Sequence, residues 1–478
     1  MSETSDLVKS ERRRVFRRIV SVAALGGLAS LLYPLMGQAR PASTPADNST
    51  STTGITSTTT TTTSTTSNFY STVGGGFDNT ANNIYATVAG GEKNAASGPG
   101  ATVAGGQKNA ATGPGASVGG GGFDGTTTAG NVASGKASTV PGGLGNNAPS
   151  DYGTVGGGQN NVAKGMNATV SGGSLNKASG MNATVSGGSE NKATGPGASV
   201  GGGGFDGTTT AGNVASGKAS TVPGGLNNSA TLDYATVGGG STNTAGAPGA
   251  TVAGGQKNAA KGMNATVPGG QSNTAAGTNS LAAGSFANVQ AVHNGAMLFS
   301  DDSNPNAFNS AAPGEFASRC TGGARFVSAV TESGAPSSGV SLAAGGGSWS
   351  SISDRNLKEN FEALDGFDVL ERLSHIPISE WNYKAQGAVI RHLGPMAQDF
   401  YEAFHIGEDD RHITTIDADG VALAAIQALY KVVRDENMEL KNQVRDEIGT
   451  LREENAALRT RLEVLERHAM TLPVSSAS

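Results

Sequence analysis

Valine recurs along much of the chain at a nearly constant interval, with Thr or Ser before it and a glycine pair soon after it. Most intervals are fifteen residues, and the valines stand at positions 73, 88, 103, 118, 140, 155, 170, 185, 200, 222, 237, 252 and 267, with Leu281 as a degenerate copy. Fifteen residues are too few for a helix pair, whereas Gly-Gly and Asn suit tight turns with positive φ. The pattern predicts one short β segment per repeat, with one inward apolar residue, stacked into a parallel β-solenoid over residues 68–290.

Two of the intervals are twenty-two residues long instead of fifteen. Both contain the sequence GGGGFDGTTTAGNVASGKASTVPGGL, at residues 119–144 and 201–226, which indicates duplication of an 82-residue block. The extra seven residues predict a loop that projects from a regular stack. Asn recurs once per repeat and predicts a side-chain ladder. Asn-Ala-Thr at positions 167, 182 and 264 satisfies a glycosylation sequon, but its spacing favours a role in the turns.

Each repeat offers one Val and a few Ala to a core, which is too little to stabilise a single chain well. Burying a second face between three chains is the simplest remedy. The segment ATVSGGSENKATG, residues 183–195, resembles the head repeats of trimeric autotransporter adhesins. That resemblance covers roughly residues 70–290 and implies a trimeric, left-handed β-roll.

The pattern changes after the repeats. Residues 291–349 alternate apolar and polar positions between glycines and predict a small β region that closes the solenoid. FDVLERLSHI predicts a short amphipathic helix, ISEWNYKA and RHLGPMAQDFYEAF predict a strand pair followed by a helix, and TTIDADGVALAAIQALYKVV begins a longer helix with Asp417 or Asp419 near its N-cap. We therefore predict a mainly β protein followed by a small α+β domain.

The last helix carries a heptad-like seam that predicts a coiled coil over residues 426–468. Apolar or Asn residues stand at positions 430, 433, 437, 440, 444, 448, 451, 455, 458, 462 and 465. Asn437 and Asn455 on this seam are of the kind that sets register and chain number. A parallel trimer matches the predicted solenoid, although the seam alone is also compatible with a dimer.

The first residues have the pattern of an export signal. A basic segment precedes an apolar run at residues 19–36, and small residues end at Ala39, so residues 1–39 are expected to be a signal peptide or an N-terminal membrane anchor. A Ser/Thr-rich linker follows at residues 40–67. The net charge of -6 gives no indication of a nucleic-acid partner, Cys320 is the lone cysteine, and we expect neither a cofactor nor a metal.

Ser353 and Lys358 are candidate catalytic residues at the border between the repeats and the helical region. A serine hydroxyl becomes a nucleophile when a neighbouring base takes its proton, and a buried lysine can be that base. Their spacing alone has a simpler explanation, since Ser-Asp before Leu and Glu is an ordinary helix cap with Lys358 solvated.

Five motifs that follow one another along the chain favour the catalytic interpretation over the helix cap. They are SDRNLKENFEAL, ISEWNYK, RHLGPMAQDF, TIDADGVALAAIQALYKVV and the coiled coil. Together they resemble the intramolecular chaperone auto-processing domain, the self-cleaving C-terminal domain of phage endosialidase tailspikes. The resemblance covers about residues 350–468, with the domain itself at 350–425. It implies that Ser353 is the nucleophile, Lys358 its general base and Ser353–Asp354 the bond that is cut.

His392 lies in the RHxGxxAQ motif of that family, where it either orients the site or supports the fold, and we favour support. Pro395 departs from the family pattern, which usually has an aromatic or aliphatic residue there.

These observations predict a secreted, surface or membrane-anchored homotrimeric fibre that is adhesin-like and is assembled by its C-terminal domain. Its partners would be its own copies and a host-surface or glycan receptor, with membrane contact only through an uncleaved N-terminal segment. Two alternatives remain: a fibre that does not cleave itself, and a glycan-degrading tailspike-like enzyme. The enzyme is disfavoured because the repeats carry only scattered carboxylates, at residues 78, 92, 124, 151, 190, 206 and 233.

Overall fold

The computed structural model describes residues 65–66 and 70–471. These residues belong to two compact units, Met1–Leu226 and Asn227–Ser478, which we describe separately. The predicted leader at 1–39 lies outside the described residues, as does the predicted linker at 40–67 except for Thr65 and Thr66. Across the described ranges, no helix combines the length and apolar character needed to cross a bilayer.

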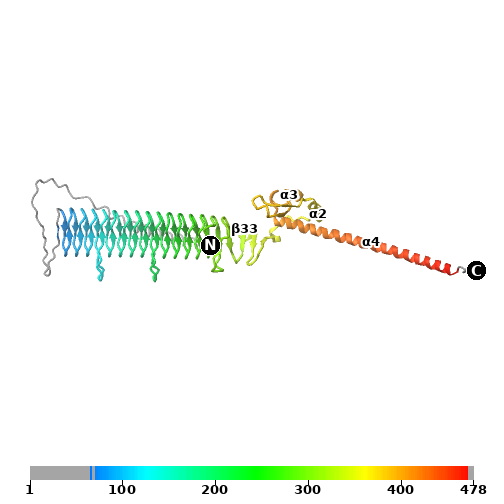
Figure 1. Ribbon diagram of the computed structural model, residues 1–478, viewed down its shortest axis with the longest axis horizontal. Coiled ribbons are helices and arrows are strands. Elements are labelled where there is room, and N and C mark those ends of the chain that lie inside the picture. The colour runs from blue at the N-terminus through cyan, green and yellow to red at the C-terminus, as the bar shows by residue number, and fades with distance from the viewer. Residues whose placement is uncertain (1–64, 67–69, 472–478) are drawn as a thin grey trace, which may run out of the picture. The chain divides into compact units, whose positions relative to one another are not determined.

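The first unit is a parallel β-solenoid, as predicted, and the solenoid has about 17 turns over both units (Figure 1). Each turn contributes strands to two sheets. The even-numbered strands, which we call the Thr-Val sheet, are β2 (Thr72–Val73), β4 (Thr87–Val88), β6 (Thr102–Val103), β8 (Ser117–Val118), β10 (Thr139–Val140), β12 (Thr154–Val155), β14 (Thr169–Val170), β16 (Thr184–Val185), β18 (Ser199–Val200) and β20 (Thr221–Val222).

The odd-numbered strands form the other sheet, which we call the Ala sheet. They are β1 (Thr65–Thr66), β3 (Thr80–Ala81), β5 (Ala95–Ala96), β7 (Ala110–Ala111), β9 (Val132–Ala133), β11 (Asn147–Ala148), β13 (Val162–Ala163), β15 (Lys177–Ala178), β17 (Lys192–Ala193) and β19 (Val214–Ala215). The prediction of a single β segment per repeat is therefore wrong. The second strand was missed because its inward residue is only an alanine, which contributes little to a hydrophobic pattern.

The core of each turn is small and completely closed. In the turn around β4 and β5, the side chains of Ala86, Val88 and Ala96 are 0% exposed, and Asn94 is 1% exposed. Equivalent Val, Ala and Asn residues are buried in the turns that follow. The core is as thin as the sequence suggests, and a buried polar residue takes up part of it.

The buried asparagines form the predicted ladder. The Asn176 side-chain amide donates to the carbonyl oxygens of Gly172 at 2.9 Å and Gly188 at 2.8 Å, and its Oδ1 accepts the backbone N–H of Asn191 at 2.9 Å. The glycine is essential to this contact, because Gly188 has φ +81° and an added Cβ would lie 2.2 Å from the Gly203 oxygen. Each Asn thus binds its own turn and the next turn at once.

The sequon asparagines occupy the corners of the turns. Asn167, Asn182 and Asn264 have φ of 55°, 57° and 54°, in the left-handed region that Asn tolerates better than most residues. This confirms the turn role predicted from their spacing.

The two inserts form projecting loops, as predicted, and Figure 1 shows both leaving the solenoid of the first unit. In the first loop, Phe123 pairs with Thr128, and Oδ1 of Asp124 accepts the N–H groups of Thr126 at 3.0 Å and Thr127 at 2.6 Å. These hydrogen bonds lower the pKa of Asp124. The second loop repeats them through Asp206.

The second unit begins with further solenoid turns. Its Thr-Val sheet contains β22 (Thr236–Val237), β24 (Thr251–Val252), β26 (Thr266–Val267), β28 (Leu281–Gly284), β30 (Met297–Ser300) and β32 (Phe316–Arg319). Its Ala sheet contains β21 (Ser229–Ala230), β23 (Thr244–Ala245), β25 (Ala259–Ala260), β27 (Thr274–Ala275), β29 (Ala287–Val289) and β31 (Phe308–Asn309). The parallel pairing thus continues beyond residue 290, through turns whose spacing no longer follows the repeat.

Hydrogen bonds to the Asp301 carboxylate stabilise the last solenoid turn. Oδ2 of Asp301 accepts the Thr321 N–H at 2.6 Å, Oδ1 accepts the Ser303 hydroxyl at 2.6 Å, and Arg319 lies 3.3 Å from Oδ1. The hydroxyl and N–H donors hold the pKa of Asp301 far below its ordinary value. A three-stranded antiparallel sheet follows, formed by β33 (Ala324–Val330), β34 (Pro336–Leu342) and β35 (Trp349–Ser351).

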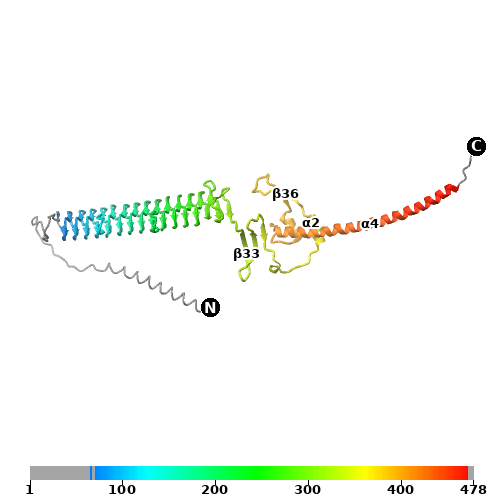
Figure 2. The same ribbon diagram turned by 90° about the horizontal axis from the view of Figure 1, so that it is seen from below.

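The predicted α+β region is present after this sheet. It contains the 3₁₀ turn η1 (Arg355–Leu357), α2 (Gly366–His375), the antiparallel pair β36 (Ser379–Trp381) and β37 (His392–Gly394), α3 (Ala397–Phe404) and α4 (Thr415–Thr471). Val369 of α2, Phe400 of α3 and Val421 of α4 form its core. Figure 2 shows α2 beside the first part of α4, where Gly366 allows close contact with Ala428.

The Thr414 side chain caps the N-terminus of the long helix. Thr414 Oγ1 accepts the backbone N–H of Asp417 at 3.1 Å and donates to the Asp417 carboxylate at 2.8 Å. This confirms that Asp417 acts at the helix N-terminus. The helix then runs for 57 residues without interruption.

We predict that Asn176→Ala destabilises the solenoid by about 3 kcal/mol per chain, because it leaves the Gly172 carbonyl and the Asn191 N–H without partners, while the Gly188 carbonyl keeps the Ser174 N–H. Chemical denaturation followed by circular dichroism measures the loss. Lys177→Ala is the matched control, since Lys177 is the exposed residue directly after Asn176, at the start of β15. Equal effects of the two substitutions would contradict the role assigned to the Asn ladder.

Removal of residues 123–129 should leave the solenoid intact, because Gly122 and Gly130 then rejoin as a turn of ordinary length. We expect a change in unfolding free energy within about 0.5 kcal/mol. Deleting residues 165–171 also removes seven residues, but from a regular turn, and should disrupt the stack. If both deletions destabilise the chain equally, the loops are part of the fold and not additions to it.

Candidate functional site

A tight turn positions the two candidate catalytic residues. Strand β35 ends at Ser351, and Asp354 then caps η1 by accepting the N–H of Asn356 on Oδ1 at 2.9 Å. The N–H of Leu357 bonds to the Asp354 carbonyl and that of Lys358 to the Arg355 carbonyl, both at 3.2 Å. These local bonds bend the chain so that Lys358 returns towards Ser353.

The structure brings Ser353 and Lys358 into contact. Nζ of Lys358 donates to Oγ of Ser353 at 2.7 Å, and both residues are exposed. A cap is present, provided by Asp354, and the lysine nevertheless reaches the serine hydroxyl, so the catalytic role of the pair stays a prediction. The contact has the length that proton transfer between a serine and a lysine requires.

Exposed apolar residues lie close to this pair in the sequence. Leu357, Phe361 and Leu364 follow the serine closely in sequence and are 41%, 68% and 69% exposed. The guanidinium of Arg355 lies 5.9 Å from the centre of the Phe361 ring. Side chains of this kind would shield the lysine from water only if another surface covered them.

His392 lies in an aromatic cluster. Its ring centre is 4.8 Å from that of Trp381 and 5.4 Å from that of Tyr383, and its Nε2 is 2.8 Å from Oε1 of Gln386. No hydrogen bond in the described structure joins His392 to Ser353 or Lys358. The supporting role of His392 stays a prediction.

Trp381 and Tyr383 were not singled out from the sequence, although they complete this cluster. Trp381 pairs with His392 across β36 and β37. The signal was available in the Trp-Asn-Tyr string, which places two aromatic residues on one face of an extended segment. Pro395, where the sequence departs from the family pattern, comes directly after β37 and leaves that strand pair intact.

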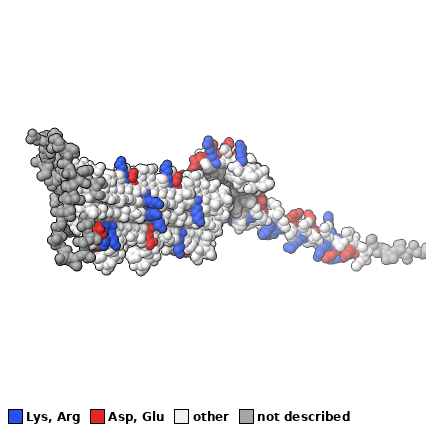
Figure 3. Space-filling view, turned by 60° about the vertical axis from the view of Figure 1, so that its left-hand side comes forward, with Lys and Arg blue, Asp and Glu red and all other residues white. Residues whose placement is uncertain are grey.

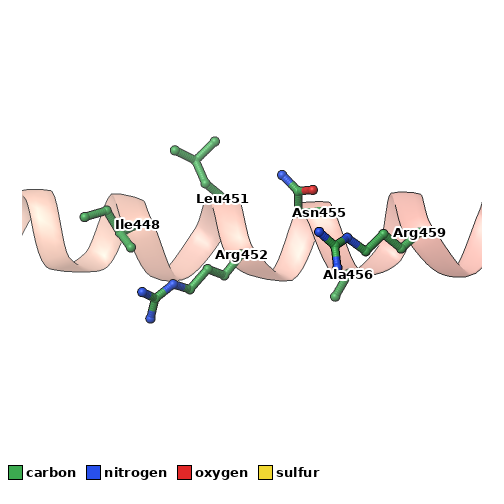
Figure 4. Close-up of a pocket in the computed structure, with 6 residues that line it drawn as sticks. All are labelled: Ile448, Leu451, Arg452, Asn455, Ala456 and Arg459. Atoms are coloured by element: carbon green, nitrogen blue, oxygen red, sulfur yellow. The ribbon is translucent and has the colours of Figure 1, made fainter.

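The predicted coiled-coil seam is exposed along α4. Leu440 is 57% exposed, Leu451 53% and Leu458 60%, and no part of the described chain packs over them. Figure 4 shows a shallow groove on this helix, where Leu451 and Asn455 project from one side and Arg452 from the other. Lysine, arginine and acidic residues alternate along the same helix in Figure 3. An apolar seam between charged faces is typical of a helix that pairs with other helices.

The comparisons with known proteins agree with part of this picture. Residues 353–405 match the family described as chaperone of endosialidase. The matched segment begins at Ser353 and contains Lys358 and His392, which confirms the resemblance over this part of the chain. No curated protein matches the chain.

Proposed function

We propose that this protein is an extracellular, homotrimeric fibre whose C-terminal domain aligns three solenoids and then cuts itself off. The observation that carries the proposal is the 2.7 Å contact between Lys358 Nζ and Ser353 Oγ at the first residue of the chaperone match. The solenoid before this border supplies the fibre, and the helices after it supply the chaperone.

The trimer is proposed from the helix seam and from the thin core. Three copies of α4 would bury the exposed leucines against one another, with Asn437 and Asn455 setting the alignment of the chains. Such a coiled coil holds three solenoids at a high local concentration before their turns pair. Residues 350–425 would act as the chaperone domain and residues 426–468 as the coiled coil.

The proposed chemistry is hydrolysis of the Ser353–Asp354 bond. A neutral Lys358 amine takes the proton of a serine hydroxyl as that oxygen attacks the carbonyl carbon of Ser353, and the proton then passes to the departing nitrogen of Asp354. Water hydrolyses the resulting ester. The products are a fibre ending at Ser353 and a free chaperone beginning at Asp354.

Within one chain, Ser353 Oγ can attack its own carbonyl carbon only by closing a four-membered ring. We therefore propose that each chain is cut by the hydroxyl of a neighbouring chain in the trimer. The same neighbour would cover Lys358, which is exposed in the single chain, and a lysine removed from water loses its charge more readily. Cleavage would then follow assembly and not precede it.

His392 is proposed to hold the β36–β37 pair in place and not to take part in the reaction. Export would depend on residues 1–39, either as a leader or as an anchor, and the fibre would present its solenoid to a host surface or glycan. A glycan-degrading activity is not proposed, because the Asp124 and Asp206 carboxylates are already bound by their own loops.

A fibre that keeps its chaperone is the second candidate, favoured by the exposure of Ser353 and Lys358 in the single chain. Cleavage distinguishes the two. We predict that the purified chain yields a C-terminal fragment of about 125 residues beginning at Asp354, and that Ser353→Ala and Lys358→Arg abolish it. The arginine keeps the positive charge but does not deprotonate, so it separates the role of a base from that of a cation.

Denaturing gels and the N-terminal sequence of the fragment measure this outcome. Glu362→Ala, at an exposed position of the same segment, is a control that leaves the dyad intact. An uncut wild-type chain would support the fibre that keeps its chaperone. Continued cleavage of Lys358→Arg would exclude Lys358 as the base, and failure of active chains to cut Ser353→Ala chains in mixed trimers would exclude cleavage between chains.

A further inference from the structure

One face of the solenoid has the same uncharged character on every described turn. In the Thr-Val sheet, Val points inwards and the residue before it points outwards; this outward residue is Thr or Ser from β2 to β26. The next outward position, two residues later, holds Gly, Ala, Ser or Pro on the same turns. The face is therefore flat and made of small side chains.

The Ala sheet has mostly small residues at the equivalent outward positions, but on some turns it carries lysine, which the Thr-Val sheet lacks from β2 to β26. Lys177 and Lys192 stand directly above one another on β15 and β17 of the first unit, and Lys261 follows β25 in the second. Burying unpaired ammonium groups is unfavourable, so this sheet suits contact with water. The two faces of one solenoid are thus chemically unequal.

The Thr-Val face becomes apolar on its last turns. On successive strands of the second unit, Thr266 pairs with Leu281, Leu281 pairs with Met297, and Met297 pairs with Phe316. Met297 is 43% exposed, Phe316 is 63% exposed, and neighbouring Phe299 is 42% exposed. The Phe299 and Phe316 rings lie 5.8 Å apart. We call Leu281, Met297, Phe299 and Phe316 the terminal apolar patch.

The Ala sheet is polar on these same turns. Asn288 of β29 and Asn309 of β31 point outwards and are joined by a hydrogen bond of 2.6 Å. The change from Thr to Leu, Met and Phe therefore concerns only one of the two faces. Several large apolar side chains exposed next to one another are typical of a surface that another molecule covers.

We infer that the outer face of the Thr-Val sheet is the surface that packs against the other copies of this chain in the fibre, with the terminal apolar patch as its anchor. This inference rests on the proposed trimer and specifies which of its surfaces meet. Another copy is the favoured occupant because a row of identical residues at constant spacing fits a straight partner with the same repeat. The anchor lies on the last solenoid turns, those nearest in sequence to the chaperone.

The position of the anchor gives assembly a direction. A chaperone that gathers three C-terminal ends would bring the terminal apolar patches together first. Their side chains differ from turn to turn, unlike the Thr row, so they fit in one alignment only. The uniform part of the face would then pair turn by turn towards the N-terminus in the register already set.

Single cysteines placed in a Cys320→Ser background test this inference through their rates of reaction with a maleimide. In the assembled protein, Met297→Cys should react at least about tenfold more slowly than Asn309→Cys, and the two rates should become equal in denaturant. A second pair, Thr251→Cys and Lys261→Cys, lies on a regular turn and should show the same order. The second pair replaces the first in the test if circular dichroism shows that the substitution at Met297 disturbs the fold.

Light scattering on the same samples separates this inference from the proposed function. If cysteines at Met297 and Asn309 react with the maleimide at equal rates in a protein of three chains, the assigned face is wrong but the proposed trimer is supported. If cysteines at Asn309 and Lys261 react slowly while cysteines at Met297 and Thr251 react fast, the interface would be assigned to the Ala sheet. A protein of one chain with all four sites reactive would overturn both proposals.

Discussion

From Asn79 to Asn273, each repeat turn of the solenoid is held to the next by the same kind of contact, in which a buried Asn amide binds glycine carbonyls. The Asn176 hydrogen bonds to Gly172 and Gly188 illustrate it. This contact stabilises a stack that has little apolar surface to bury, since Val and Ala are the only core residues of most turns. It also makes the turns nearly interchangeable. Three such stacks have many alignments of similar energy, and nothing in the repeats distinguishes the correct one.

The C-terminal part of the chain contains what the repeats lack. Residues 353–405 match the chaperone of endosialidase family, and α4 carries a long seam that has no partner in the single chain. A device that gathers chains and fixes their alignment is needed only while the fibre forms. If cleavage occurs as proposed, the fibre would have no easy way back to separate chains, because the part proposed to set the register would be gone.

The repeat pattern was sufficient to predict the parallel solenoid, the Asn ladder and the two projecting loops. It was insufficient for the second strand of each turn, because Ala96 and its equivalents are buried completely without being strongly hydrophobic. The repeat pattern also ends at residue 290, whereas the parallel stack continues. The strands that contain Leu298 and Phe316 keep the parallel pairing but lack the Thr-Val pattern. Pairing between turns depends on backbone hydrogen bonds, and these leave no mark on the sequence.

At the candidate site, the spacing of Ser353 and Lys358 was compatible with both a cap and a dyad. The family resemblance favoured the dyad, and the geometry shows that one turn holds the cap and the contact together. The aromatic cluster around His392 was not predicted, because it depends on the pairing of two strands that are separated by a loop.

The most direct test of this account is the mass of the uncut protein in solution, measured by multi-angle light scattering on the full chain carrying Ser353→Ala. The account predicts three times the chain mass of 47.4 kDa, with the solenoid folded. A single chain of that mass, equally well folded, would show that the stack needs neither partners nor a chaperone, and would contradict the account.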